Sequence, residues 1–306
     1  MVIPANCHVL VTGGTGFIGR NLCPRLLARG CQVTVLTRDA GRAATVLPTG
    51  IRFIEHIPQL GDGPFVNAVV NLAGEPLAGR RWTDGRKRRF EESRTGLTKT
   101  LFSYFAESRE RAPRVLISGS AIGFYGPQDD NLLTESASQT PSFSSRLCTG
   151  WENAACMFEI LYTRVVRLRT GVVLGDGGAL AAMLPAFRAG AGGAMASGKQ
   201  WMSWIHVEDM VRIIEFCLYQ EALHGPVNAT APVPVTNREF ASQLARTLGR
   251  PAILRMPAPV LRLLFGEMAE ELLIAGQRVV PAALLKAGYH FAYPELEPAL
   301  RQILGK

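Results

Sequence analysis

Four glycines stand in the segment VLVTGGTGFIGRN, after a short apolar run and at the start of an amphipathic stretch. Their spacing satisfies both Gly-x-x-Gly-x-x-Gly and Gly-x-Gly-x-x-Gly. Glycine permits a tight turn and the close approach of a pyrophosphate, and the free N–H groups of a helix start add partial positive charge. The dinucleotide phosphate site predicted from this pattern comprises Gly13, Gly14, Thr15, Gly16, Phe17, Ile18 and Gly19.

The end of the second expected strand favours NADP(H) over NAD(H). NAD-specific folds place an acid there to accept hydrogen bonds from the ribose hydroxyls. This chain has Thr37 and Arg38, whose guanidinium can pair with a 2′-phosphate, and Arg42 can assist. Asp39 follows at once and keeps contact with a ribose open as an alternative.

The fourth expected strand closes with Asn71-Leu72-Ala73-Gly74. Small residues are needed where backbone runs beside an adenosine and its ribose. We therefore predict cofactor contacts at Leu72, Ala73 and Gly74, with a plain strand end as the alternative.

A parallel sheet is expected to position these residues. Short β-branched runs alternate with amphipathic stretches through the first half of the chain, which is the pattern of βαβ units. Strands are expected at residues 8–12, 32–37, 51–55, 68–72, 114–118 and 164–169, and helices at 16–29, 85–111 and 148–161. Their near-continuous apolar character is typical of strands buried on both faces. The predicted class is α/β, a Rossmann-type doubly wound parallel sheet with a smaller C-terminal substrate lobe.

The alternation ends near Gly175, where glycine-rich connections begin around a short helix at 179–188. Thr236 and Glu239 form a capping-box pattern before an apolar-periodic run that stops at Gly249. We predict an NADP-binding domain at residues 1–175, with sheet additions from 200–235, and a lobe at 176–306. This lobe includes a small, mainly helical domain at about 250–306.

Several motifs resemble one family in order and content: TGGTGFIG, VNLAG, ISGSAIGFYG, RLRTGVVLG and WIHVEDM. They resemble the extended short-chain dehydrogenases/reductases. NLAGEPLAGRRW and the terminal GQRVVPAALLKAGYHFAYPELEPAL are similar to a branch called the epimerase family, whose members carry an extra C-terminal domain. The resemblance implies NADP as cofactor, with contacts on the glycine turn, Thr37, Arg38, Leu72, Ala73, Arg94 and Val173.

The resemblance also exposes a missing catalytic pair. The parent family uses a Ser or Thr, a Tyr acid/base, and a Lys four residues later that lowers the pKa of the Tyr. Ser120 matches the hydroxyl member, but SRLCTGWE stands where Tyr-x-x-x-Lys belongs, with Leu147 and Trp151 at the two positions. No lysine lies between Lys99 and Lys199, so a shift of register does not restore the pair.

Three classes of function remain open. The first is an oxidoreductase or epimerase with Ser120 and Tyr125 as catalytic residues and Cys148, Glu152 or His206 as further proton carriers. The second is an NADP(H)-sensing regulatory or binding module without turnover, and the third is a nucleic-acid binder. Structural roles compete with the catalytic ones: Tyr125 packing beside the nicotinamide, Cys148 as a small helix residue, Glu152 paired with an arginine, and His206 as a buried histidine near a helix start.

The substrate, a small molecule of unknown identity, is expected between the lobes over the carboxyl ends of the strands. Its predicted lining adds Trp201, Trp204 and His206 to Ser120 and Tyr125, with the alternative that the tryptophans belong to the core. Residues 190–193 are a candidate flap, although glycine equally marks tight packing.

Composition bounds the remaining possibilities. The net charge is +8, and residues 80–94 hold a local concentration of seven cations beside three acids, which predicts either a solvated helix face or an anion site more than a nucleic-acid surface. Six scattered cysteines and five histidines show no metal-ligand spacing, so we expect reduced thiols and no metal. No leader or long apolar run is evident, which predicts a cytoplasmic protein without membrane contact, with a homodimer left open.

Overall fold

A seven-stranded parallel sheet forms the centre of the protein in a computed structural model that describes residues 6–61 and 63–306. Its order is β3-β2-β1-β4-β5-β7-β11, with every neighbouring pair parallel. The strands are β1 (His8–Thr12), β2 (Gln32–Leu36), β3 (Ile51–Ile54), β4 (Ala68–Asn71), β5 (Val115–Ala121), β7 (Arg164–Thr170) and β11 (Gly225–Ala229). The predicted α/β class with a doubly wound parallel sheet is confirmed.

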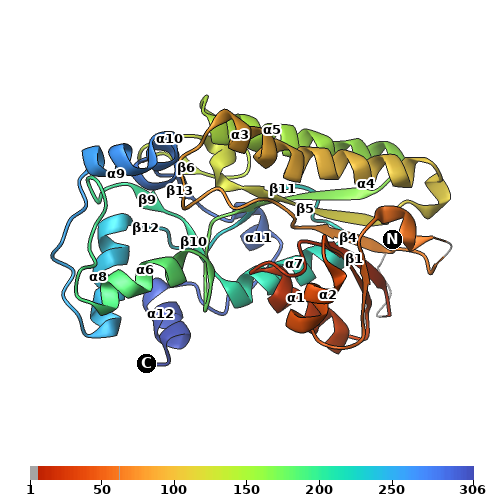
Figure 1. The fold of residues 1–306 in the computed structure, drawn as a ribbon, viewed down its shortest axis with the longest axis horizontal. Helices are drawn as coiled ribbons and strands as arrows, with labels where there is room; N and C mark the ends of the chain where they lie inside the picture. Colours follow the sequence, from red (N-terminus) through yellow and green to blue (C-terminus); the bar gives the residue numbers. More distant parts are fainter. Residues whose placement is uncertain (1–5, 62) are drawn as a thin grey trace.

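Helices cover both faces of the sheet (Figure 1). On one side lie α1 (Gly19–Ala28), α2 (Ala40–Val46) and α7 (Val207–Tyr219), and on the other lie α3 (Asp84–Glu91), α4 (Leu97–Ala106) and α5 (Phe143–Cys156). Two apolar clusters, one on each face, include fully buried residues of β1, β4 and β5. This double burial explains the continuous apolar runs of the strands.

The strand order reverses between β1 and β4, since the chain moves outward to β2 and β3 before returning to the other side of β1. Loops leaving the carboxyl ends of β1 and β4 therefore separate and open a crevice, where doubly wound folds bind ligands. The glycine turn follows β1, and Leu72-Ala73-Gly74 follows β4. The fold thus brings the two predicted cofactor segments to one edge.

Several predicted element bounds differ from those of the structure, and three of the differences bear on the site. The helix expected at 85–111 is interrupted by a π-helical turn at Glu92–Gly96 and ends at Ala106. The helix expected from residue 148 begins at Phe143, because Ser142 and Ser145 form a capping box upstream of the apolar periodicity. Strand β5 continues to Ala121, so Ser120 lies in the strand itself.

The capping box at Thr236 is confirmed: its hydroxyl accepts from the Glu239 N–H, and α8 (Asn237–Leu248) ends at Gly249 in a left-handed conformation. The lobe around α8 also contains short strands and helices. They are β8 (Val172–Leu174), β10 (Trp204–His206), β9 (Trp201–Met202), β12 (Val235–Thr236), α6 (Gly178–Arg188) and α12 (Leu296–Leu304). Buried side chains of α6, α8 and α12 share one apolar cluster.

The chain after residue 250 packs against three different regions. Helices α9 (Ala258–Phe265) and α10 (Glu267–Ala269) lie near α3 and α5, and β13 (Arg278–Val279) pairs with β6 (Leu132–Leu133). Helix α11 (Ala282–Lys286) lies beside β11. None of the helices within residues 6–61 and 63–306 has the length and apolar character needed to cross a bilayer.

Candidate cofactor and active site

The glycine turn is packed so closely that side chains are excluded. Gly13 has a φ of +69°, and the Gly16 N–H donates to the Gly13 carbonyl over 3.0 Å. A Cβ on Gly19 would lie 2.4 Å from the Gly13 carbonyl oxygen, and one on Gly14 would lie 2.8 Å from the Val35 side chain. The turn therefore brings bare backbone to the start of α1, as a pyrophosphate cradle requires.

Gly19→Ala is expected to weaken nicotinamide dinucleotide binding because its methyl group must displace backbone rather than a flexible side chain. Overpacking of this kind typically costs about 1–3 kcal/mol, or roughly five- to 150-fold in affinity if the cost falls on the bound conformation. Fluorescence titration with NADPH measures it. Gly85→Ala is the control, since Gly85 has no positive φ and a Cβ there would meet only the Arg88 guanidinium, at 4.0 Å. Equal affinities of Gly19→Ala and wild type would contradict the cradle.

The remaining residues of the turn differ in exposure. Thr15 is exposed, whereas Phe17 and Ile18 are half-buried. The Phe17 ring lies against the backbone of Gly175 and its loop, which follows β8, and Ile18 packs against the core beneath α1. Val173, another predicted contact, is half-buried in β8 and packs against the same core.

Two unpaired cations mark the end of β2. Arg38 is exposed, and within the described residues neither its guanidinium nor that of Arg42 makes a hydrogen bond or ion pair. The Asp39 carboxylate instead accepts from the Arg42 backbone N–H over 2.8 Å as the N-cap of α2. Thr37 lies between strand and cap, with its N–H bonded to the Ile54 carbonyl. The Asp39 carboxylate is therefore used as a helix cap, whereas the guanidinium groups of Arg38 and Arg42 can bind a ligand phosphate.

Residues after β4 are held in place by a buried chain of polar side chains. The Thr12 hydroxyl donates to Asn71 over 2.6 Å, and Asn71 donates to Thr98 over 2.8 Å. The Ala73 N–H in turn donates to the Thr12 hydroxyl over 3.2 Å. These bonds fix the end of β4, and with it Leu72, against the end of β1.

Arg94 lies beside this segment, on the π-helical turn. A Cβ on Gly74 would come within 2.9 Å of the Arg94 guanidinium carbon, so glycine lets the cation approach the backbone. Its guanidinium donates to the Glu75 carbonyl over 2.9 Å and lies 5.3 Å from the centre of the Trp151 ring. Burial lowers the pKa of Arg94. Arg94, a predicted cofactor contact, therefore lies next to Gly74, after the carboxyl end of β4.

Leu147 and Trp151, at the positions of the missing Tyr and Lys, are both buried. Leu147 belongs to an aromatic cluster with Trp82 and Phe143, and Trp151 lies over the end of β5. A Cβ on Gly119 would come within 2.8 Å of the Trp151 ring. The space that a Tyr–Lys pair needs is filled by apolar side chains, so an acid/base must come from elsewhere.

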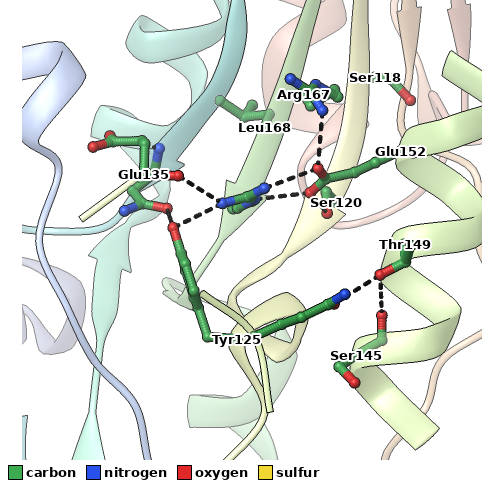
Figure 2. A network of polar contacts seen from close by, with 12 residues as sticks. Ser118, Ser120, Tyr125, Glu135, Ser145, Thr149, Glu152, Arg167 and Leu168 are labelled. Carbon is green, nitrogen blue, oxygen red and sulfur yellow. Dashed lines mark hydrogen bonds and ion pairs between the residues drawn. The ribbon is translucent and has the colours of Figure 1, made fainter. Parts of the chain in front are cut away.

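A buried polar network joins β5, α5 and β7 (Figure 2). The Ser120 hydroxyl donates to one Glu152 oxygen over 2.8 Å, and Arg169 donates to both oxygens over 2.8 and 3.0 Å. Burial alone would lower the pKa of Arg169, but the bonds and charge of Glu152 raise it above its usual value. The expectation that Glu152 pairs with an arginine is confirmed, and the pair fixes an acceptor beside Ser120.

Tyr125 lies at the far end of this network. Its hydroxyl donates to Asn228 over 2.7 Å and accepts from Arg169 over 3.0 Å, and the residue has no exposed surface. Burial raises the pKa of Tyr125, which makes it a poorer base at neutral pH. The Tyr125 hydroxyl thus holds Arg169 in place, and an acid/base role for Tyr125 stays a prediction.

Two further candidate proton carriers, Cys148 and His206, lie in buried surroundings. Burial raises the pKa of the Cys148 thiol to about 11, so it remains protonated at neutral pH. His206 is buried at the start of α7, where Nδ1 accepts from the Glu208 N–H over 3.1 Å and Nε2 faces Gln302 over 2.9 Å. The alternative interpretation of His206, a buried histidine at a helix start, is confirmed.

The three predicted substrate-lining residues do not converge. Trp204 has no exposed surface and packs in the core of the C-terminal lobe, so its prediction as a lining residue is wrong for this structure. Trp201 borders a cavity of about 320 Å³ near Asp130, and His206 borders another of about 490 Å³ beside Gln302. Neither lining includes Ser120. The sequence order WMSWIH placed the tryptophans together, but β9 and β10 belong to different two-stranded sheets.

The C-terminal domain supports the network from two sides. Both Glu271 oxygens accept from the first backbone N–H groups of α5, at Phe143 and Ser144, over 2.7 Å each. Asn228, the partner of Tyr125, donates to the Val280 carbonyl over 2.9 Å. The helix that carries Glu152 and the strand that carries Asn228 are thus positioned by residues after 250.

Sequence reasoning missed Arg169, Asn228 and Glu271. Arg169 carried a usable signal, because it is one of three arginines among the apolar residues of the strand RVVRLRTG, and a cation that a sheet buries needs a partner. Nothing local marks Asn228 or Glu271, whose roles come from contacts with distant segments.

Comparisons with known proteins agree with this geometry. The model of the NAD dependent epimerase/dehydratase family matches residues 9–228, and that of a domain of unknown function (DUF1731) matches residues 256–303. The epimerase family protein Mb2239 of Mycobacterium bovis is 39% identical over 300 residues, 97% of each chain. The chloroplastic SDR39U1 homolog of Arabidopsis thaliana is 38% identical over 97% of this chain and 86% of its own.

Among solved structures, human epimerase family protein SDR39U1 (isoform 2), crystallised with NADPH, superposes with a TM-score of 0.87. It is 35% identical, and the match covers 98% of this chain and 99% of the human one. Similarity therefore extends through both the dinucleotide-binding fold and the C-terminal domain.

Proposed function

The chain belongs to the NAD-dependent epimerase/dehydratase family, and on that premise we propose that it binds NADP(H) and performs oxidoreductase or epimerase chemistry on a small molecule. The observation that carries the cofactor assignment is the pair of unpaired cations, Arg38 and Arg42, beside an Asp39 already used as a helix cap. The NADPH in the human relative supports the same choice. When bound, the cofactor supplies or accepts a hydride.

Arg38→Ala is expected to narrow the preference for NADPH over NADH by about ten- to a hundredfold. A charge-assisted hydrogen bond contributes roughly 1.5–3 kcal/mol, and NADH lacks the phosphate that receives it. Titration of both cofactors against wild type and variant measures the ratio. Arg250→Ala, which removes another exposed cation far along the chain, should leave the ratio unchanged. Equal wild-type affinities for the two cofactors would refute the assignment.

For the reaction, we propose that Ser120 carries the proton exchanged with the substrate and that Glu152 accepts the Ser120 hydrogen bond. The 2.8 Å contact orients the hydroxyl proton toward the carboxylate and leaves the oxygen lone pairs for a substrate hydroxyl. Arg169 holds Glu152 in this orientation, and Tyr125 and Asn228 hold Arg169. This arrangement takes the place of the missing Tyr–Lys pair, whose positions Leu147 and Trp151 occupy, as the source of acid/base assistance.

The test uses the full-length protein loaded with NADPH or NADP⁺. Fractionated metabolite pools are added while the absorbance of the reduced nicotinamide is followed. Oxidation or reduction that one fraction triggers and Ser120→Ala suppresses supports the reaction. Fractions that change only the cofactor affinity would instead favour an NADP(H)-sensing module.

We propose that the basic segment at 80–94 serves the fold and the cofactor rather than nucleic acid. Arg81 donates to carbonyls at the end of α9, and Lys87 pairs with Glu267 over 2.5 Å. These charges are engaged by the C-terminal domain, while Arg94 lies beside Gly74. We also propose a cytoplasmic location, in keeping with the reduced thiols expected from six scattered cysteines.

A further inference from the structure

Two buried thiols face one another at the amino ends of β1 and β2. Cys7 directly precedes β1 and Cys31 directly precedes β2, one step before the His8–Gln32 pair in the parallel register. The Gln32 N–H donates to the Cys7 carbonyl over 2.9 Å, and the two Sγ atoms are 3.2 Å apart. Neighbouring strands are about 4.8 Å apart, which lies within the range that a disulfide bridges.

Their surroundings distinguish the two thiols. The hydrogen bond from Cys7 is the largest of the effects that lower the pKa of Cys31 to about 6, and the positive charge of Arg29 lowers it further. The same contact with Cys31, together with burial, raises the pKa of Cys7. The hydrogen bond between the two sulfurs and the nearby Arg29 charge thus favour the thiolate form at Cys31, which is the better nucleophile of the pair.

Cys31 also lies closer to solvent. Its Sγ is 3.7 Å from the Tyr219 hydroxyl, and Tyr219 lines a surface cavity of about 470 Å³. Arg25, Arg29 and Arg212 line the same cavity, and only Glu215 opposes them with a negative charge. The excess of positive charge in this lining favours a small anionic molecule. The half-buried Tyr219 side chain stands between the cavity and Cys31, so a molecule in the cavity would reach the thiol by displacing that side chain.

We propose that Cys7 and Cys31 form a dithiol that a low-molecular-weight anionic disulfide oxidises to an intrachain disulfide. The Cys31 thiolate attacks one sulfur of the external disulfide, forming a mixed disulfide and releasing one thiolate, which takes up a proton. Cys7 loses its proton and attacks the Cys31 sulfur, which releases the second thiol. The protein dithiol is oxidised by two electrons, and the external disulfide is reduced to two thiols.

This modification lies outside the proposed catalytic function, but it affects the same half of the sheet. Cys7 and Cys31 are 24 positions apart, and the segment between them contains β1, the glycine turn and α1. Oxidation would enclose the glycine turn in a covalent loop. The disulfide would lie at the amino ends of β1 and β2 and would leave the carboxyl ends of the strands, where the cofactor is expected, open.

The experiment treats the native full-length protein with glutathione disulfide, then denatures it and counts free thiols by maleimide labelling and mass spectrometry. The wild type is expected to lose two of its six thiols, with the linkage mapped to Cys7 and Cys31 in a peptide digest. Cys7→Ser should retain glutathione on Cys31, because the resolving thiol is absent. Cys31→Ser should lose no thiol. Cys217→Ser, which removes another fully buried cysteine, should still lose two.

A wild-type protein that keeps all six thiols under native conditions would overturn the proposal, as would a disulfide mapped to any other pair. If the Cys7 thiol of the Cys31→Ser variant reacted with glutathione disulfide at the wild-type rate, the assigned order of attack would be overturned. The wild-type measurement needs no variant, so it decides the proposal even where a serine variant fails to fold.

Discussion

Ser120→Ala should lower the rate of substrate turnover by about 10²- to 10⁴-fold, the usual contribution of acid–base assistance, while NADPH affinity is retained. The hydroxyl is held 2.8 Å from a carboxylate oxygen of Glu152, and the missing Tyr–Lys pair leaves no second proton carrier at the usual positions. Removing the hydroxyl therefore removes the proton path without touching the glycine turn. Steady-state kinetics on the substrate found by the metabolite screen and an NADPH titration give the two quantities.

Ser118→Ala is the matched control, because Ser118 is fully buried in the same strand and, among the described residues, its hydroxyl bonds only to the Gly119 carbonyl, over 3.4 Å. Its rate should stay near that of the wild type. Turnover that survives Ser120→Ala unchanged would show that the chemistry takes place elsewhere. A parallel loss of rate and NADPH affinity would indicate that Ser120 supports the cofactor site instead.

Glu152→Ala should lower the free energy of unfolding by about 3–5 kcal/mol, the typical cost of removing one partner from a buried ion pair. The side chains of Glu152 and Arg169 are only 3% and 4% exposed, so the variant leaves a guanidinium without its carboxylate and without access to water. The Ser120 hydroxyl loses its acceptor as well. Denaturant unfolding followed by circular dichroism gives the change in stability.

The comparison variant is Glu297→Ala, which breaks the exposed pair with Arg301, four residues along α12. Exposed pairs of this spacing contribute roughly 0.3–0.5 kcal/mol, since solvent screens both charges. A Glu152→Ala variant no less stable than Glu297→Ala would mean that Arg169 finds water or another acceptor when its partner is removed. The Glu152–Arg169 pair would then contribute less to the free energy of unfolding than its burial and hydrogen bonds indicate.

The cofactor half of the site could be predicted from sequence because its determinants are local. Gly13, Gly16 and Gly19 fall within one turn between a strand and a helix, and that turn has one common use. Arg38 is equally local, since it lies two residues after an apolar strand. Strand periodicity then fixed the parallel sheet, because continuous apolar runs require cover on both faces.

The boundaries of the helices and the buried polar network were harder to predict from the sequence. Helix α5 begins at Phe143 because Ser142 caps it and Glu271, 128 positions away, binds its first N–H groups. Ser120, Glu152 and Arg169 lie on three elements whose side chains meet only once β5 and β7 pair beneath α5. No spacing rule connects them.

By itself, the sequence determined a Rossmann-type sheet, a glycine turn after its first strand, a basic residue after its second strand and the absence of the Tyr–Lys pair, since each is a property of a few consecutive residues. Tertiary structure alone decided that Glu152 pairs with Arg169, that Tyr125 is buried behind them, and that Trp204 belongs to the core. Burial and ion pairing depend on which distant segments share a volume, and packing rather than local order fixes that.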